Sequence, residues 1–300
     1  MVLGNFLKNQ NVFQPIKYLV YAALLINVFL FMAEEMSSSA ALNTSVTSIA
    51  SFFQIFSATI DTGAWLVLLI FFELETYVLS DQLLRSVVGW FIRGTKLLCL
   101  AAITVAWWGY IAELSGLMTS QPMSAGLCET LDASWSVLIN LDQFEPFSAS
   151  ACGAGEWLVL TDYERVIASP AFLQSAVWLA ALDVINASAW ILVVIVLEIE
   201  VRVLLSRQHT LSLLSESVRR VKIPLYLILF LAAVYWGFEG SFLDFWDAIL
   251  WLFAFFVIEG NMSTWRDETD QSQEAGTKAL CRVGLGPPFQ NRRFFGRKGP

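Results

Sequence analysis

The sequence predicts an all-α, polytopic membrane protein with six transmembrane helices arranged as three helical hairpin repeats. The composition, six long apolar stretches and a recurring motif favour this fold class. Of the 300 residues, 57% are hydrophobic and only 15% are charged, whereas about 25% are charged in an ordinary soluble domain. So few charged groups do not cover the apolar surface of a soluble chain of this size.

Six stretches have the length and character of transmembrane helices. A hydrocarbon core about 30 Å thick needs about 20 mostly apolar residues, and we expect spans near 16–33, 59–79, 96–112, 172–197, 222–238 and 245–260. We place Pro15, Pro170 and Pro224 at the first turns of the first, fourth and fifth helices, where proline loses no hydrogen bond. The stretches 76–93 and 201–220 are expected to continue the second and fourth helices into the cytoplasm.

The charge distribution predicts the topology. With the N-terminus, the even loops and the C-terminal tail in the cytoplasm, only Arg165 of the 18 Lys and Arg residues lies on the other side. Because basic loops stay inside, we expect a multi-pass protein with both termini cytoplasmic, in a bacterial inner membrane or another plasma membrane. Residues 1–260 then form the helical bundle.

The inward-running helices share the motif [Asp/Asn]-x3-Trp-x7-Glu. It occurs as Asp61, Trp65 and Glu73, as Asn186, Trp190 and Glu198, and as Asp247, Trp251 and Glu259. The outward-running helices each carry a Lys and a Glu 17 positions apart: Lys17 and Glu34, Lys96 and Glu113, and Lys222 and Glu239. The two patterns together predict three repeated hairpins.

The outer and C-terminal additions are distinct from the bundle. Residues 114–170 form a small acidic extracytoplasmic insertion, and the run from Glu156 to Leu160 is typical of a short strand. Cys128 and Cys152 both lie in this insertion, so we favour a disulfide between them over two unpaired cysteines. Residues 261–300 lack helical periodicity and are expected to form a disordered, basic cytoplasmic tail.

Several ionisable groups are predicted at membrane depth, where each is costly and therefore a candidate for function. A polar ring in the outer half would contain Asp61, Asp183, Asn186, Asp244 and Asp247. The glutamates Glu73, Glu198 and Glu259 would lie near the inner face, with Lys17, Lys96 and Lys222 as their counter-charges. One interpretation is a cation or proton path. The other is a set of helix–helix hydrogen bonds and interface residues without any transported ion.

Two functional classes fit these features. The first is a small transporter or channel for a cation, a proton or a cationic solute. The second is a non-enzymatic scaffold that binds other membrane proteins through its outer domain or cytoplasmic helices. The net charge of −8 argues against a nucleic-acid partner. The single histidine and the absence of nucleotide or metalloprotease motifs predict no enzyme, no cofactor and no metal centre.

Overall fold

The computed structural model describes residues 10–42, 46–74, 79, 83, 86–124, 126, 130–132, 134–148, 156–205 and 212–256. Within the helices, the side chains at 10–13, 50, 198, 200–205 and 212–219 lie outside this description. The chain divides into two compact units, one of residues 15–252 and one of residues 1–14 and 253–300. The unit of residues 15–252 contains the sheet and most of each long helix.

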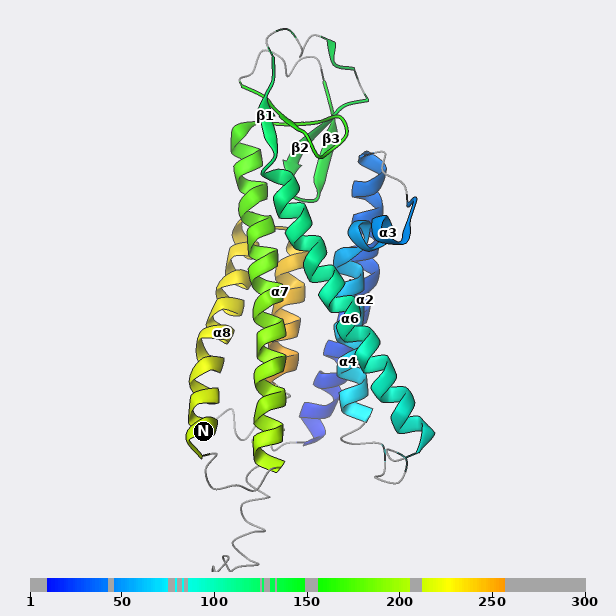
Figure 1. Cartoon of the computed structure of the whole chain (residues 1–300), viewed down its shortest axis with the longest axis vertical. Coiled ribbons are helices and arrows are strands. Elements are labelled where there is room, and N and C mark those ends of the chain that lie inside the picture. The colour runs from blue at the N-terminus through cyan, green and yellow to red at the C-terminus, as the bar shows by residue number, and fades with distance from the viewer. Residues whose placement is uncertain are drawn as a thin grey trace, which may run out of the picture. The chain divides into compact units, whose positions relative to one another are not determined.

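Helices make up most of the described chain (Figure 1). In order they are α2 (Gln10–Ala41), α3 (Ile49–Ile55), α4 (Ser57–Glu73), α6 (Val87–Leu117), α7 (Pro170–Leu205), α8 (Ser212–Glu239) and a last helix over 242–256. Helix α6 packs against α4 and α7, and α7 packs against α8.

Four of these helices are long and apolar enough to cross a membrane: Gln14–Ala41, Val87–Leu117, Pro170–Leu197 and Arg220–Glu239. The six-span hairpin arrangement is not confirmed. Helix α4 has 17 residues, a length of about 26 Å, and the described part of the last helix ends at Phe256.

Several helix boundaries differ from the prediction. Helix α6 begins at Val87, where the Ser86 Oγ accepts a hydrogen bond from the Val88 N–H at 3.2 Å, so residues 87–93 do not continue the second helix. Residues 201–205 continue the fourth helix as part of α7, whereas residues 212–220 belong to α8. Pro170 begins α7 as expected, but Pro15 and Pro224 lie inside their helices. The hydropathy pattern detects the apolar part of a helix and misses its polar first turns.

The all-α prediction is wrong in one respect, because the insertion contains a five-stranded sheet. The strand order is β1-β4-β5-β2-β3, with β1 at Ser120–Pro122, β2 at Ser136–Asn140, β3 at Gln143–Pro146, β4 at Leu158–Leu160 and β5 at Val166–Ala168. Strands β2 and β5 pair in parallel and the other neighbours are antiparallel. The strand expected within 156–160 is therefore present.

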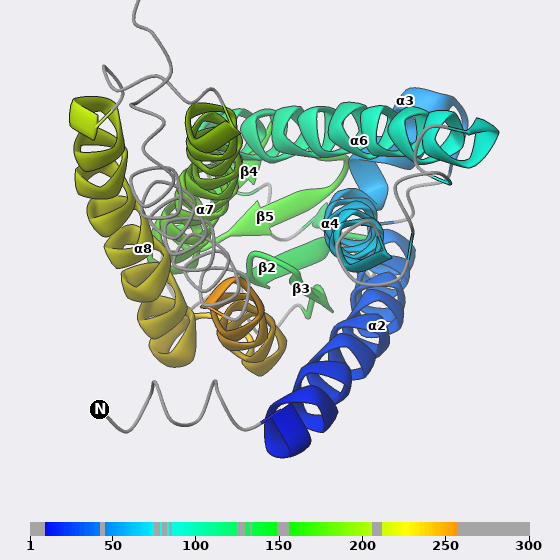
Figure 2. The same cartoon turned by 90° about the horizontal axis from the view of Figure 1, so that it is seen from below.

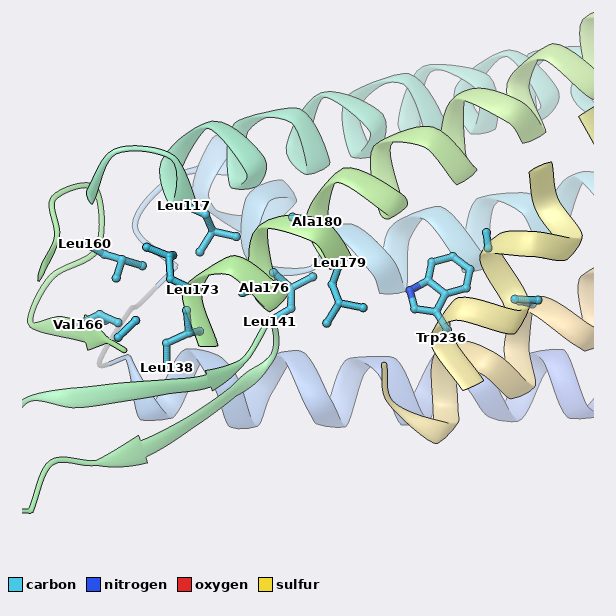
Figure 3. Close-up of a cluster of buried hydrophobic side chains, with 14 residues drawn as sticks. Leu117, Leu138, Leu141, Leu160, Val166, Leu173, Ala176, Leu179, Ala180 and Trp236 are labelled. Carbon is cyan, nitrogen blue, oxygen red and sulfur yellow. The ribbon is translucent and has the colours of Figure 1, made fainter. Parts of the chain in front are cut away.

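The sheet has an apolar cluster on each face, because side chains alternate along a strand. On one face Leu138, Leu160 and Val166 pack with Leu173 and Ala176 of α7, as Figure 3 shows. The other face packs Val137 and Ile167 with Leu131 and Phe147. Figure 2 looks along the helices and shows β2, β3 and β5 beyond them, between α4 and α7 in projection.

Helix α2 illustrates how the helices sort their faces. Lys17, Val20, Leu24, Asn27 and Phe31 are buried and follow the three- and four-residue spacing of one helix face. The opposite face exposes large apolar side chains: Tyr18, Leu19, Leu25, Ile26, Phe29 and Leu30. An exposed apolar face of this length is suited to contact with lipid.

The disulfide prediction is not tested, because Cys128 and Cys152 lie outside the described residues. Cys281 and the rest of the predicted tail also lie outside them. Cys99 is a free, buried cysteine within α6, as expected.

Candidate functional site

Eight carboxylates gather at the end of the bundle that meets the sheet. We call them the acidic cluster. They are linked by mutual electrostatic interactions and comprise Glu34 and Glu35 of α2, Asp61 of α4, Glu113 of α6, Asp142 of the β2–β3 turn, Asp183 of α7, and Asp244 and Asp247 of the last helix.

The structure brings together four of the five residues of the predicted polar ring: Asp61, Asp183, Asp244 and Asp247 interact within this cluster. The fifth, Asn186, lies one turn further along α7 and is partly exposed. Asp61 is near the start of α4 and Asp247 near the start of the last helix. The cluster therefore lies toward the ends of these helices that adjoin the sheet.

At the other end of α4, Glu73 forms an ion pair with Lys17 of α2. The Lys17 side chain is 2% exposed and the Glu73 side chain 13%. This is one of the three pairs expected between the lysines and the inner glutamates. Lys96 is partly exposed and Lys222 is buried. The Glu198 side chain and all of Glu259 lie outside the described residues, so the other two pairs stay predictions.

Two members of the cluster also hold helix ends. Glu35 accepts hydrogen bonds at the start of α4 from the Ala58 N–H at 2.7 Å and the Thr59 hydroxyl at 2.5 Å. Asp244 forms a capping box with Ser241, whose hydroxyl donates to the carboxylate at 2.8 Å while the Asp244 N–H donates back to that hydroxyl at 3.1 Å. Free N–H groups at a helix start favour a carboxylate, so these contacts fix both side chains.

Asp61 and Asp247 each accept a hydrogen bond from another helix. Asp61 accepts one from the Tyr110 hydroxyl of α6 at 3.4 Å, and Asp247 accepts one from Asn27 Nδ2 of α2 at 2.7 Å. Trp65 and Trp251 lie four residues after these aspartates, and residues four apart lie on one helix face. The Asp-x3-Trp spacing therefore places each tryptophan on the helix face of its aspartate.

The β2–β3 turn brings the insertion into the site. Leu141 in this turn is buried in the same apolar cluster as Trp236, and Figure 3 shows the turn directed along the helices. The Ser38 hydroxyl of α2 donates to the Asp142 carbonyl oxygen at 2.7 Å. These contacts place the neighbouring Asp142 carboxylate among the helix ends.

The Asp142 residue exposes part of its surface. Desolvation of its carboxyl group among the helix ends, followed by the carboxylates of Glu113 and Asp244, raises the pKa of Asp142 well above its ordinary value. The other seven carboxylates are each partly exposed. Among the described residues, none of the eight forms an ion pair with a lysine or arginine. The arrangement concentrates negative charge that a cation or a shared proton would stabilise.

Sequence reasoning missed half of this cluster. The 17-residue spacing from Lys17 and Lys96 marks Glu34 and Glu113, although it does not indicate that they meet the aspartates. Nothing in the sequence signals Glu35 as a helix cap or Asp142 as a partner, because both depend on contacts between segments far apart in the chain.

No group of three or more His, Cys, Asp or Glu side chains in the described part of the chain has the geometry of a metal site. The comparisons with known proteins find no matching family model, no matching curated protein and no matching solved structure.

Proposed function

We propose that the protein is an integral membrane protein that transports a cation, protons or a cationic solute, and that the acidic cluster is where the transported species enters. The observation that supports this most is the convergence of eight carboxylates from six segments of the chain without a paired basic residue among those described. The four apolar helices support the membrane part of the proposal.

The energetic argument concerns charge. Two unit charges 4 Å apart interact by about 4 kcal/mol at an effective dielectric constant of 20. Asp183 interacts with both Asp244 and Glu113, and Glu113 also interacts with Glu35. Repulsion within such a group falls when a cation or a proton binds. Hydrogen bonds at Asp61 and Asp247 hold the carboxylates in place without neutralising them.

Location gives a second argument. The cluster lies between the helices and the β2–β3 turn, and its members keep part of their surface accessible. An acidic entrance raises the local concentration of cations and the rate at which they bind. Cation selectivity in channels uses rings of Asp and Glu in this way.

The scaffold alternative has its own support in the sheet. The insertion has apolar clusters on both faces of the sheet, so it is an ordered domain and not a simple loop. A partner protein that bound this domain would give the insertion a role without transport.

The test uses proteoliposomes with purified full-length protein. We expect a cation- or pH-dependent flux that Asp61→Asn and Asp183→Asn abolish, because each change removes one charge with almost no change of shape. Asp132→Asn is the matched control, since Asp132 is exposed, is outside the cluster and bonds locally to Ser134.

Absence of flux of any common cation in the wild type, or undiminished flux in both cluster variants, would contradict transport through this site. Tolerance of both variants combined with loss of cellular function on deletion of 114–170 would favour the scaffold.

A further inference from the structure

Helix α3 is a short helix that presents apolar side chains at its surface. Ile49 is 79% exposed and Phe52 is 43% exposed, and residues three apart lie on one helix face. The Phe52 ring also contacts the Phe56 ring, with 5.1 Å between the ring centroids. A capping box between Ser48 and Ser51 fixes the start of the helix. The exposed apolar face therefore belongs to a well-defined helix.

Contacts with α6 give the position of α3 along the bundle. Helix α3 packs against α6 and α4, and Figure 1 shows it near the end of the bundle that carries the sheet. Phe56 caps the end of α3, and Ser57 is the first residue of α4. A Cβ on Gly109 of α6 would lie 3.4 Å from Ser57 Cβ. The end of α3 is therefore level with residues 108 and 109 of α6.

The surface of α6 marks the extent of the hydrocarbon layer. Large apolar side chains are exposed along this helix at Trp90, Leu97, Leu98, Val105 and Trp108. Trp90 and Trp108 are 18 positions apart, which is about 27 Å along the helix and close to the thickness of a hydrocarbon core. Tryptophan is enriched at both membrane–water interfaces. Trp108 therefore marks the boundary nearer the sheet, and α3 lies level with it.

We infer that α3 is an interfacial helix that binds the lipid bilayer through Ile49 and Phe52, at the boundary between headgroups and acyl chains. Figure 2 looks along the helices and shows α3 at the periphery of the bundle beside α6, where lipid surrounds the protein. The inference rests on the apolar helices that could cross a membrane and not on transport by the acidic cluster.

The chemistry of the segment suits this boundary. No charged residue occurs between Glu35 and Asp61 in the sequence, so no ionic group of this segment has to enter the acyl region. Gln54 is exposed and lies two positions after Phe52, a step that turns the helix by about 200°. The helix thus has an apolar side for the acyl chains and a polar side for the headgroups, as interfacial helices have.

The size of the surface favours lipid over a protein partner. The seven residues of α3 extend over about 10 Å, whereas a stable protein interface buries about 800 Å² on each partner. A bilayer needs no such area at α3, because the long apolar helices already hold the chain in the membrane.

Lipid binding at α3 bears on the start of α4. Phe56 is both the cap at the end of α3 and the cap at the start of α4. Asp61 of the acidic cluster lies five positions later. Binding of α3 to the bilayer therefore fixes the depth at which α4 begins.

The first experiment measures depth with nitroxide labels on single cysteines, in full-length protein in liposomes with the four native cysteines replaced by alanine. Collisions with oxygen report on acyl chains, and collisions with a water-soluble nickel chelate report on water. Labels at Ile49 and Phe52 probe the apolar face, and a label at Gln54 is the matched control on the same helix. Labels at Trp108 and at Glu145, which is exposed on β3, are the references for the boundary and for water.

We expect the ratio of oxygen to nickel collisions at Ile49 and Phe52 to match that at Trp108 and to exceed those at Gln54 and Glu145. A ratio at Ile49 equal to that at Glu145, or equal ratios on the two sides of α3, would overturn the inference. Protection of the Ile49 label from both reagents would also overturn it, because a second copy or another protein would then cover α3.

The second experiment compares melting temperatures of Ile49→Glu and Gln54→Glu in nanodiscs of zwitterionic lipid at pH 8. Ile49→Glu places a carboxylate against acyl chains and should lower the melting temperature. Gln54→Glu places the same charge among headgroups and should not. An exposed side chain in water tolerates such a change, so equal melting temperatures for the two variants would overturn the inference even if a label disturbs the fold.

Discussion

Removal of Lys17 tests a buried ion pair between two helices. The Lys17 and Glu73 side chains join α2 to α4 and are 2% and 13% exposed. Lys17→Met keeps a long, flexible side chain and removes the ammonium group. Glu73 then loses its ion pair with Lys17 at a poorly hydrated site.

The expected magnitude follows from this burial. Breaking a buried ion pair by removing one partner costs about 3–5 kcal/mol, whereas replacing both partners by apolar residues is often neutral. A loss of 3 kcal/mol corresponds to a fall in melting temperature of about 6–12 °C for a chain of this size. The double variant Lys17→Met, Glu73→Leu should recover most of that loss, because both charges of the pair are then removed.

The assay is thermal unfolding in detergent of chains in which Cys128, Cys152 and Cys281 are replaced by serine. A thiol-reactive fluorophore then labels buried Cys99 only when the helices separate. Lys96→Met is the matched control, because Lys96 is a partly exposed lysine and exposed ion pairs contribute about 1 kcal/mol or less. Equal melting temperatures for wild type and Lys17→Met, or additive losses in the double variant, would refute the reasoning.

Three further predictions concern stability. Gly240→Ala should lower the free energy of unfolding by about 1–3 kcal/mol, because a Cβ there would lie 2.7 Å from Trp236 Cδ1. Gly63→Ala is the control and should not lower it, since the nearest contact of a Cβ there is 3.8 Å. Equal melting temperatures for the two variants would contradict this prediction. Asn27→Leu removes the hydrogen bond to a carboxylate of the last helix and should cost about 1–3 kcal/mol, measured by thermal unfolding against Asn186→Leu. The pKa of Asp142 is raised in the folded state. Its contribution to the free energy of unfolding is therefore fully present below the unfolded pKa of about 3.9. That contribution is lost as pH rises through the folded pKa. Melting temperatures at pH 5 and pH 8 should therefore differ less in Asp142→Asn than in the wild type, and an equal difference would contradict the assignment.

Helices are predictable from the sequence where they contain a long apolar stretch. The cores of α2, α6, α7 and α8 lie where hydropathy predicts helices, because a long apolar stretch satisfies its backbone groups within one helix. Helix ends are harder to predict. We expected Pro224 in the first turn of its helix, but α8 already begins at Ser212. The polar segment before Pro224 is also helical, because it continues the apolar helix that follows it.

The sheet was harder to predict than the helices. Strands β1, β4 and β5 have three residues each, and so short a run carries little alternation of its own. The parallel pairing of β2 with β5 joins segments about 30 residues apart. The place of Asp142 depends on that pairing, because the β2–β3 turn reaches the helices only when the sheet rests on α7. Local patterns do not contain such information.

Residues of the candidate site were predictable where the pattern that marks them lies within a single helix. Asp61 and Asp247 were found because each lies four residues before a tryptophan, a spacing that places the two side chains on one helix face. Their partners from other helices, Tyr110 and Asn27, carry no such periodic signal. Asn27 is 1% exposed and lies within an apolar stretch, where a buried amide needs a hydrogen-bond partner.

The acidic cluster divides by what already holds each carboxylate. Glu35 and Asp244 bond to the first turns of helices, so neutralising either would weaken a helix start as well as remove a charge. Glu34 and Glu113 neither cap a helix nor accept an indole hydrogen bond among the described residues. The charges of Glu34 and Glu113 therefore contribute least to holding the helices of the cluster. Asp142 interacts with Glu34, Glu113, Asp183 and Asp244 together, so a positive charge beside Asp142 would relieve repulsion with four carboxylates at once.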